Sequence, residues 1–514
     1  MSFSRIGIPR TLGRLSSPAF VCRQCLHTQP LKATASSQVA RQVVRSHALS
    51  RNLISTSTST NTATHARTRW LVGGSRTFFR SATKSSSGST VTAEAATAEA
   101  SSGARAGTRS SSFPETNSKA VGYWLIGSAV SVFGIVIFGG MTRLTESGLS
   151  ITEWRPVTGS LPPRNAEDWE SEFSKYRASP EFALLNPHMT LDEFKKIYYM
   201  EWTHRLWGRF IGLTFVLPTV YFIARKQVTR KMAFNLVGIS ALIGFQGFIG
   251  WWMVKSGLKD DLFAPGSHPR VSQYRLTAHL GTAFLCYSAM LLSGLSVLRT
   301  RRLVADPASA TKLFSQLQNA AITPFRRYVL AMTALVFTTA MSGALVAGLD
   351  AGLIYNEFPK MGVGLTPPMA ELFDKFYSRK EDGSDLWWRN MLENPSLVQL
   401  DHRALAMTTF CAVVAMFVWS RRLGAVLPIS ARKGSMGVLH LALLQVALGI
   451  STLIYMVPTH LAATHQAGAL ALLTGSLVLA HRLHVSKSTV SLIQRQLLKS
   501  AGSGGAARLP PRRI

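Results

Sequence analysis

Eight runs of mostly apolar residues limit what this chain can fold into. A helical run of about 20 residues spans the ~30 Å hydrocarbon core of a bilayer. The runs lie at about 121–141, 203–223, 233–254, 274–298, 327–348, 402–420, 434–456 and 461–481. An even number of crossings returns the chain to the side on which it started. We therefore predict an all-α integral membrane protein with eight transmembrane helices and with both termini on one side of the membrane.

Residues 1–118 have a different composition. They hold 15 of the 56 Lys and Arg residues but only three acids, many Ser and Thr residues, and no long apolar run. A positive, acid-poor segment of this kind is typical of a mitochondrial transit peptide followed by a disordered spacer. The alternative is a basic tail that binds nucleic acid, but aromatic residues do not interleave with the basic ones as single-strand binding requires. We therefore predict mitochondrial targeting and no nucleic-acid partner.

The connections between the apolar runs alternate in charge. Those after the second, fourth and sixth runs hold 14 Lys and Arg residues and one acid, Asp306. The opposite connections, at 142–201, 255–275 and 349–401, hold 16 basic and 21 acidic residues. Basic loops stay on the inner side of a membrane. We therefore place both termini and the basic loops in the mitochondrial matrix, and the long acidic loops in the intermembrane space.

The first four spans resemble the last four. Glu146 and Gly148 follow the first span as Asp350 and Gly352 follow the fifth. Further matched pairs are His204 with His402, Gln246 with Gln445, and His279 with His465. Each half has an even number of spans, so the two repeats share one orientation. We predict two parallel-repeat four-helix bundles, within which the two glutamines join neighbouring helices by hydrogen bonds.

These patterns divide the chain into five segments. They are the transit peptide and disordered spacer (1–118), an N-terminal four-helix bundle (119–300), a matrix linker (301–325), a C-terminal four-helix bundle (326–483) and a basic matrix tail (484–514).

Four histidines lie at one depth of the predicted membrane domain. His204, His279, His402 and His465 each stand near the start of an even-numbered span, and all even spans start on the same side. Ionisable residues inside a membrane are costly and usually functional. Two opposed imidazoles are also what a haem iron with two histidine ligands requires. Zinc favours closer ligand sets that include Cys or acids, so we predict haem ligation with two histidines in each bundle.

The repeat breaks beside these histidines. Glu201 precedes His204 by three residues, whereas Gln399 stands at the same place before His402. Positions i and i+3 share a helix face, so Glu201 lies one turn from the histidine. A carboxylate in a half-buried pocket can accept a proton or stabilise a cation, and an amide can do neither. We therefore predict that the N-terminal bundle is the reactive half and that the C-terminal bundle holds a permanent cofactor.

Three arginines lie near the same helix starts. Arg205, Arg209 and Arg403 carry guanidinium groups suited to haem propionates. The same side chains are equally suited to lipid headgroups at the interface.

These residues together resemble the haem A synthase family of the mitochondrial inner membrane. The similarity covers about residues 119–485 and rests on five motifs: GGMTRLTESGLS at 139–150, EWTHR at 201–205, TAHLG at 277–281, LDHRA at 400–404 and THQ at 464–466. The resemblance implies an oxidoreductase that converts a methyl group of haem O to a formyl group by successive hydroxylation, with oxygen from water, to make haem A for cytochrome c oxidase.

The resemblance also implies roles for single residues and for partners. His204 and His279 would ligate the iron of the substrate haem O, His402 and His465 that of a haem b cofactor, and Glu201 would be the catalytic carboxylate. The haem sites would lie toward the intermembrane space. The implied partners are the enzyme that makes haem O, cytochrome c oxidase assembly factors, a ferredoxin-type electron carrier, membrane lipid and, for a homo-oligomer, a second copy of the chain.

Two other functions fit parts of the pattern. A bis-histidine membrane cytochrome b would only transfer electrons, but such proteins usually stagger their haems toward both faces, and here all four histidines lie on one side. A parallel-repeat transporter would use the histidines as proton relays, but it would favour broken helices or charges near the middle of the membrane.

Overall fold

The structure is a computed structural model that describes residues 113–264 and 267–502. Most of the predicted transit peptide and spacer, and the last residues of the basic tail, lie outside these ranges.

Eight long helices dominate the part of the chain that the structure describes. Each is long and apolar enough to cross a membrane, and each overlaps one of the predicted runs. They are α2 (Lys119–Leu144), α5 (Leu191–Ala224), α6 (Arg230–Gly257), α7 (Gln273–Ala305), α9 (Ile322–Gly348), α12 (Pro395–Leu423), α13 (Ile429–Ile454) and α14 (Thr459–Arg482). The prediction of an all-α multi-pass membrane protein is confirmed.

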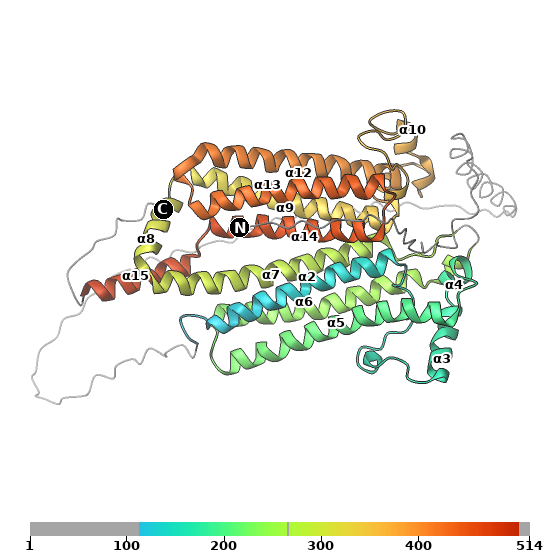
Figure 1. The fold of residues 1–514 in the computed structure, drawn as a ribbon, viewed down its shortest axis with the longest axis horizontal. Coiled ribbons are helices and arrows are strands. Elements are labelled where there is room, and N and C mark those ends of the chain that lie inside the picture. The colour runs from blue at the N-terminus through green and yellow to red at the C-terminus, as the bar shows by residue number, and fades with distance from the viewer. Residues whose placement is uncertain (1–112, 265–266, 503–514) are drawn as a thin grey trace, which may run out of the picture. The chain divides into compact units, whose positions relative to one another are not determined.

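The membrane helices form two sets (Figure 1). In the first set, α2 and α6 each pack against both α5 and α7. In the second set, α9 and α13 each pack against both α12 and α14. The sets meet where α7 contacts α9, where α14 contacts α2, and where α7 contacts α14. Every contact within the first set therefore has a counterpart in the second.

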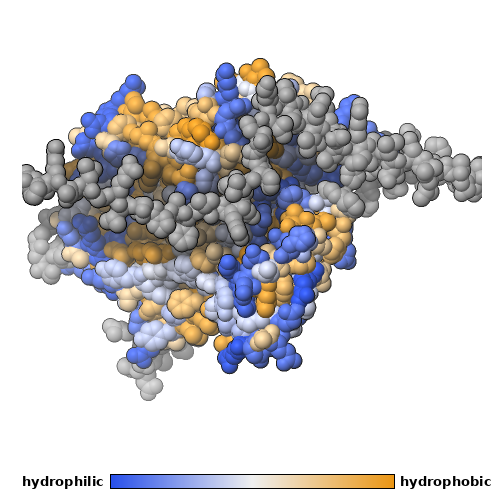
Figure 2. All heavy atoms as spheres, turned by 45° about the vertical axis from the view of Figure 1, so that its right-hand side comes forward, coloured by the Kyte–Doolittle hydropathy of each residue, from blue (hydrophilic) through white to orange (hydrophobic). Residues whose placement is uncertain are grey.

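The outer faces of these helices are apolar. Large side chains such as Phe210, Leu217, Phe234 and Phe248 are more than half exposed in the isolated chain. On the face shown in Figure 2, apolar side chains form broad patches that hydrophilic side chains flank. Such surfaces are expected where lipid replaces water as the solvent.

The helices are longer than the apolar runs that predicted them. Helix α5 begins at Leu191, where the Thr190 side chain and Glu193 form a capping box. Residues 191–202 are polar enough to lie outside the hydrocarbon core of the bilayer, and they belong to the same helix. His204 is therefore more than three turns inside its helix, although it lies near the start of the apolar run.

Short helices fill the connections at both ends of the long ones. At one end lie α3 (Ala166–Arg177), α4 (Pro180–Leu185), α10 (Met369–Leu372) and α11 (Leu386–Glu393). At the other end lie α8 (Pro307–Leu317) and α15 (Lys487–Gly502) (Figure 1). The aromatic side chains of α3 and of the first turns of α5 form a separate apolar cluster. This cluster fixes the long loop over the end of the first set.

Asp350 joins the two sets at that same end. Its carboxylate accepts hydrogen bonds from Arg143 at 2.8 Å and from Arg270 at 3.2 Å. Arg143 also donates to the carbonyl oxygen of Ala347. Both arginines come from the first set, so this ion-pair cluster ties its loops to the second.

Candidate functional site

The four predicted histidines lie on four different helices. His204 is on α5 and His279 on α7, both in the first set, while His402 is on α12 and His465 on α14, both in the second. Within each set the two imidazoles are near enough to interact electrostatically. The structure thus brings the histidines together as two pairs, as the sequence predicts.

Each imidazole packs directly against a glycine of the preceding membrane helix. A Cβ atom placed on any of these glycines would lie 2.7–3.0 Å from the Cε1 atom of the ring. The four contacts are Gly139 with His204, Gly250 with His279, Gly343 with His402, and Gly449 with His465. Real Cβ contacts almost never fall below 3.0 Å. A side chain at Gly139 or Gly449 would therefore displace the ring, and one at Gly250 or Gly343 would require the ring to move by a few tenths of an ångström. Sequence reasoning missed this role, although both pairs of glycines recur at matched positions of the repeat.

The His402 ring is held in one tautomer by its neighbours. Its Nδ1 lies 2.8 Å from the Oγ atom of Ser342, whose hydroxyl hydrogen is donated to the carbonyl oxygen of Thr339. A serine hydroxyl has a single hydrogen, so when it donates to Thr339 the Ser342 oxygen accepts a hydrogen from Nδ1. The Nε2 atom is then left with a free lone pair, which is the form of imidazole that binds a metal.

The matched histidine in the first set lacks this support. Phe138 stands where Ser342 stands in the second set, and its ring lies parallel to that of His204, with 10° between the planes and 6.4 Å between the centroids. The Nδ1 atom of His204 is buried and has no hydrogen-bond partner among the described residues. Nothing in that part of the chain selects one tautomer of this ring.

The two glutamines link neighbouring helices. The Nε2 atom of Gln246 donates to the carbonyl oxygen of His279 at 2.9 Å and lies 3.2 Å from the Nδ1 atom of the same residue. The Nε2 atom of Gln445 donates to the carbonyl oxygen of His465, also at 2.9 Å. The prediction that they join helices is confirmed. Each fixes the backbone at the turn that carries a histidine.

Glu201 is buried and fully occupied by donors. Its Oε1 atom accepts hydrogen bonds from Nε and Nη2 of Arg205 at 3.0 and 2.6 Å. Its Oε2 atom accepts from the Ser150 hydroxyl at 2.6 Å and from the backbone N–H of Ile151 at 2.7 Å. A carboxylate has about four lone-pair sites, so all of them are used. The loop after α2 is thereby fastened to the turn that carries His204.

Gln399 occupies the matched place in the second set, and its hydrogen bond to the loop runs in the opposite direction. It is 2 % exposed, and its Nε2 atom donates to the carbonyl oxygen of Tyr355 at 3.1 Å. Tyr355 matches Ile151 in the repeat. The carboxylate therefore accepts from the loop backbone in the first set, whereas the amide donates to it in the second.

The three arginines are held mainly by backbone carbonyl groups. Arg205 donates to Ile151 and Glu153 in addition to Glu201. Arg209 donates to the carbonyls of residues 155 and 156, and Arg403 to those of residues 355 and 360. Among the described residues, Nη1 of Arg209 and Nε of Arg403 are buried without a partner. Contact of all three with haem propionates stays a prediction.

A second buried carboxyl group lies in the loop above the first set. Glu181 on α4 is 4 % exposed and accepts a hydrogen bond from the Tyr176 hydroxyl at 3.0 Å. Burial, with a smaller contribution from Glu201 and Glu146, raises the pKa of Glu181 to about 8. Sequence reasoning missed this residue, because an acid in an acidic loop carries no signal of burial.

The donor set fits a group that takes two axial ligands. Within residues 113–264 and 267–502, no group of three or more His, Cys, Asp or Glu side chains is placed to hold a metal ion. The histidines instead come in pairs on separate helices, within apolar sets of helices, and one of them presents a free Nε2 lone pair. A haem needs one imidazole on each face and apolar walls around the macrocycle.

Comparison with known proteins identifies the family. The family model described as cytochrome oxidase assembly protein (COX15-CtaA) matches residues 122–477. The chain is 55% identical over 367 residues to the Heme A synthase COX15 of Saccharomyces cerevisiae, covering 71% of this chain and 76% of that protein. It is 46% identical over 367 residues to the human protein of the same name, covering 71% and 83%.

A third relative joins two proteins in one chain. The Heme A synthase-mitochondrial ferredoxin fusion protein of Schizosaccharomyces pombe is 50% identical over 373 residues, which cover 71% of this chain and 60% of the fusion. The match to the family model extends through all eight membrane helices, and with it the chain belongs to the COX15-CtaA family of cytochrome oxidase assembly proteins.

Proposed function

We propose that this protein is a haem A synthase, which oxidises a methyl group of haem O to a formyl group to make haem A for cytochrome c oxidase. The observation that carries this proposal is the pairing of four intramembrane histidines with a buried carboxylate beside only one pair. Relatives that match most of the chain bear the same name. A bis-histidine cytochrome that only transfers electrons would not need the difference between Glu201 and Gln399.

The two pairs of histidines have different ligands in this proposal. His204 and His279 bind the iron of the substrate haem O, and His402 and His465 bind that of a resident haem b. The two sets differ at one matched pair of histidines: Ser342 supports Nδ1 of His402, which suits a permanent ligand, and nothing among the described residues supports Nδ1 of His204. The other pair does not follow this division, because Nδ1 of His279 has Gln246 beside it and Nδ1 of His465 is buried without a partner among the described residues. When bound, haem b supplies a one-electron carrier.

Glu201 is the catalytic carboxylate in this proposal. With oxygen taken from water, each of the two oxidation steps on the methyl group releases one pair of electrons and one pair of protons. Glu201 stabilises positive charge that develops at the oxidised carbon, because its own charge is held in place by Arg205 and Ser150. To accept a proton it must first release one of its four donors, and the Ser150 hydroxyl is the one that can rotate away. The reaction needs a partner that exchanges electrons, and the fused relative supports a ferredoxin-type protein in that role.

The protein is a multi-pass membrane protein of mitochondria, and we place it in the inner membrane. Both termini and the basic loops face the matrix, and the haem sites face the intermembrane space. The charge difference between the two sets of loops supports this orientation.

Two parallel-repeat bundles, at 119–300 and 326–483, complete the proposal. The matched helix contacts and the four matched glycine–histidine contacts support the repeat. The enzyme that makes haem O and the oxidase assembly factors are the partners that such a reaction requires.

Pigment extraction tests the proposed function. The full chain is purified from a host that makes haem O. Its haems are extracted and separated, and the amount of each is measured relative to the amount of protein. We expect haem b together with haem O or haem A. Haem b alone would instead indicate an electron-transfer cytochrome. A protein that carries no haem would indicate a transporter.

A further inference from the structure

A third glutamine joins the two sets of helices to each other. Gln466 lies on α14, directly after the predicted ligand His465, and its Nε2 atom donates to the carbonyl oxygen of Val136 on α2 at 2.7 Å. The same amide packs against Gly140, where an added Cβ atom would overlap it. Helix α2 accommodates the glutamine because residue 140 has no side chain.

The turn of α2 that Gln466 contacts also supports His204. Residues 136–140 form this turn, and its Gly139 packs against the His204 ring. The path from one pair of histidines to the other has three links. They are the peptide bond between His465 and Gln466, the hydrogen bond from Gln466 to the turn, and the contact of the turn with His204.

The opposite interface between the sets carries a leucine at the matched place. In the repeat, α7 and α9 correspond to α14 and α2, and Leu280 corresponds to Gln466. A leucine side chain cannot donate a hydrogen bond, and Ala344 stands where Gly140 stands. The polar link is therefore specific to the side of the interface that leads to His204.

We propose that Gln466 is a positioning residue that couples the two haem sites, so that haem b and haem O strengthen each other's binding. The Nδ1 atom of His465 is buried without a partner among the described residues, so ligation of iron fixes this ring more firmly than the chain alone does. The neighbouring amide is then held against α2, in the place that supports His204. By linkage, ligation at His204 strengthens ligation at His465 to the same degree. The inference rests on the proposed function, which supplies the two haems.

A single hydrogen bond carries a modest coupling. We expect the lower end of the usual range for two coupled sites, about fivefold. Each set therefore still binds its own haem, and a loss at one site reaches the other only in part.

Release of haem b measures the coupling. The full chain, loaded with haem b and without an electron acceptor, is mixed with excess apomyoglobin, which captures any haem that dissociates. The haem b that stays on the chain is extracted and measured over time, with and without prior binding of haem O. We expect haem O to slow the release about fivefold in wild type, because differences in affinity appear mainly in the dissociation rate. Gln466→Leu, which copies Leu280, should release haem b at one rate with and without haem O.

A second variant breaks the same link from the other helix. Gly140→Ala copies Ala344 and places a Cβ atom where the amide of Gln466 lies. The amide is the end of a flexible side chain, so it moves aside and loses its hydrogen bond to Val136. This variant should also release haem b at one rate, and it tests the inference if Gln466→Leu does not fold.

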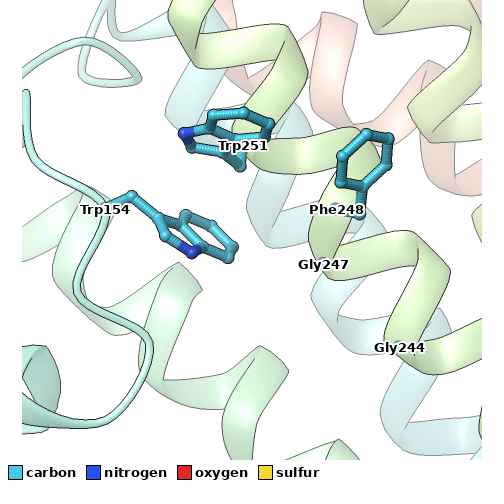
Figure 3. A pocket seen from close by; sticks show the side chains of 5 residues that line it. All are labelled: Trp154, Gly244, Gly247, Phe248 and Trp251. Atoms are coloured by element: carbon cyan, nitrogen blue, oxygen red, sulfur yellow. The ribbon is translucent and has the colours of Figure 1, made fainter.

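Two control variants leave the link intact. Tyr287→Phe removes a hydrogen bond of 2.7 Å to Thr474, which joins α7 to α14 about two turns beyond the histidine of each helix. Phe248→Leu changes the aromatic groove that Trp154, Phe248 and Trp251 line on the first set (Figure 3). Both variants should keep the fivefold effect of haem O.

The outcomes separate this inference from the proposed function. If Gln466→Leu keeps the wild-type effect of haem O, or if either control loses it, the coupling does not run through Gln466 and the inference is wrong. If wild type converts haem O but haem O does not change the release of haem b, the inference fails and the proposed function stands. If wild type neither binds nor converts haem O, the proposed function fails.

Discussion

The two sets of membrane helices share one scaffold and differ where a haem would touch them. Both place an imidazole against a glycine and fix its backbone through a glutamine. The first set has Glu201 and Phe138 where the second has Gln399 and Ser342. The common features would hold a macrocycle in either set. The differences remove the hydrogen bond to Nδ1 of the matched histidine, His204, and add a charge beside it, which suits a reacting substrate.

Removal of the carboxylate should have the largest effect. Glu201→Gln replaces the carboxylate by a neutral amide, as Gln399 has at the matched place of the second set. It thereby removes the negative charge opposite a developing cation. We expect haem A formation to fall by about 10²–10⁴-fold, the range for groups that act on charge or protons in a transition state. Haem b content should stay unchanged. Quantitative haem extraction after timed expression measures both.

A distant acid provides the control for that experiment. Glu167→Gln changes an exposed side chain on α3 and should leave haem A formation at the wild-type rate. Normal haem A production by Glu201→Gln would remove this residue from the mechanism.

The glycine contacts make the comparison sharper, because they can be broken in one set at a time. Gly343→Ala places a Cβ atom 3.0 Å from Cε1 of His402 and should weaken haem b binding by up to about 3 kcal/mol, roughly a hundredfold. Gly139→Ala makes the matching contact with His204, at 2.7 Å, and should leave haem b in place while weakening haem O binding.

Absorbance titrations with each haem measure these effects. Gly437→Ala serves as the control, since its added Cβ atom meets nothing within 4 Å. Equal loss of both haems in Gly343→Ala would show that the two sites are not independent.

The hydrogen bond on His402 should matter less than its packing. Ser342→Ala removes the acceptor of the Nδ1 hydrogen, and loss of such a partner lowers metal affinity by 10–100-fold in general. We expect roughly tenfold faster loss of haem b, measured as the decay of its absorbance in the purified protein. Phe138→Ser should do the reverse for the first set and slow the release of haem O. No change in haem b retention would mean that the tautomer of His402 is set elsewhere.

Much of this arrangement could be predicted from the sequence, because the relevant patterns are local. Hydropathy marks the membrane helices, and matched spacing marks the four histidines and the difference between Glu201 and Gln399. The start of α5 was not predicted, because hydropathy reports the apolar stretch and not the helix. Two of the four donors to Glu201 come from a loop about 50 residues earlier, and such long-range contacts leave no local pattern.

Other features were visible in the repeat but not interpretable from it. Phe138 and Ser342 occupy matched positions, yet only the folded chain shows that both lie against a histidine. The same holds for Gly139 and Gly343. Without the contact, a glycine or a serine in a membrane helix indicates close helix packing in general and no particular partner.

The smallest expected effect concerns Glu181, which belongs only to the loop of the first set. Its pKa of about 8 in the folded protein lies above the ordinary value of 4.5, so the folded state binds its proton more tightly than the unfolded state. The stabilisation from this proton is complete below pH 4.5 and is lost as the pH rises toward 8.

Glu181→Gln keeps an acceptor for Tyr176 but cannot ionise. For each kcal/mol of stabilisation that is lost across this pH range, we expect the thermal midpoint of wild type to fall by about 2–4 °C relative to that of the variant. Melting curves between pH 5 and pH 8 measure the difference, with Glu167→Gln as a control that should follow wild type. Parallel curves for wild type and Glu181→Gln would mean that water reaches this carboxyl group.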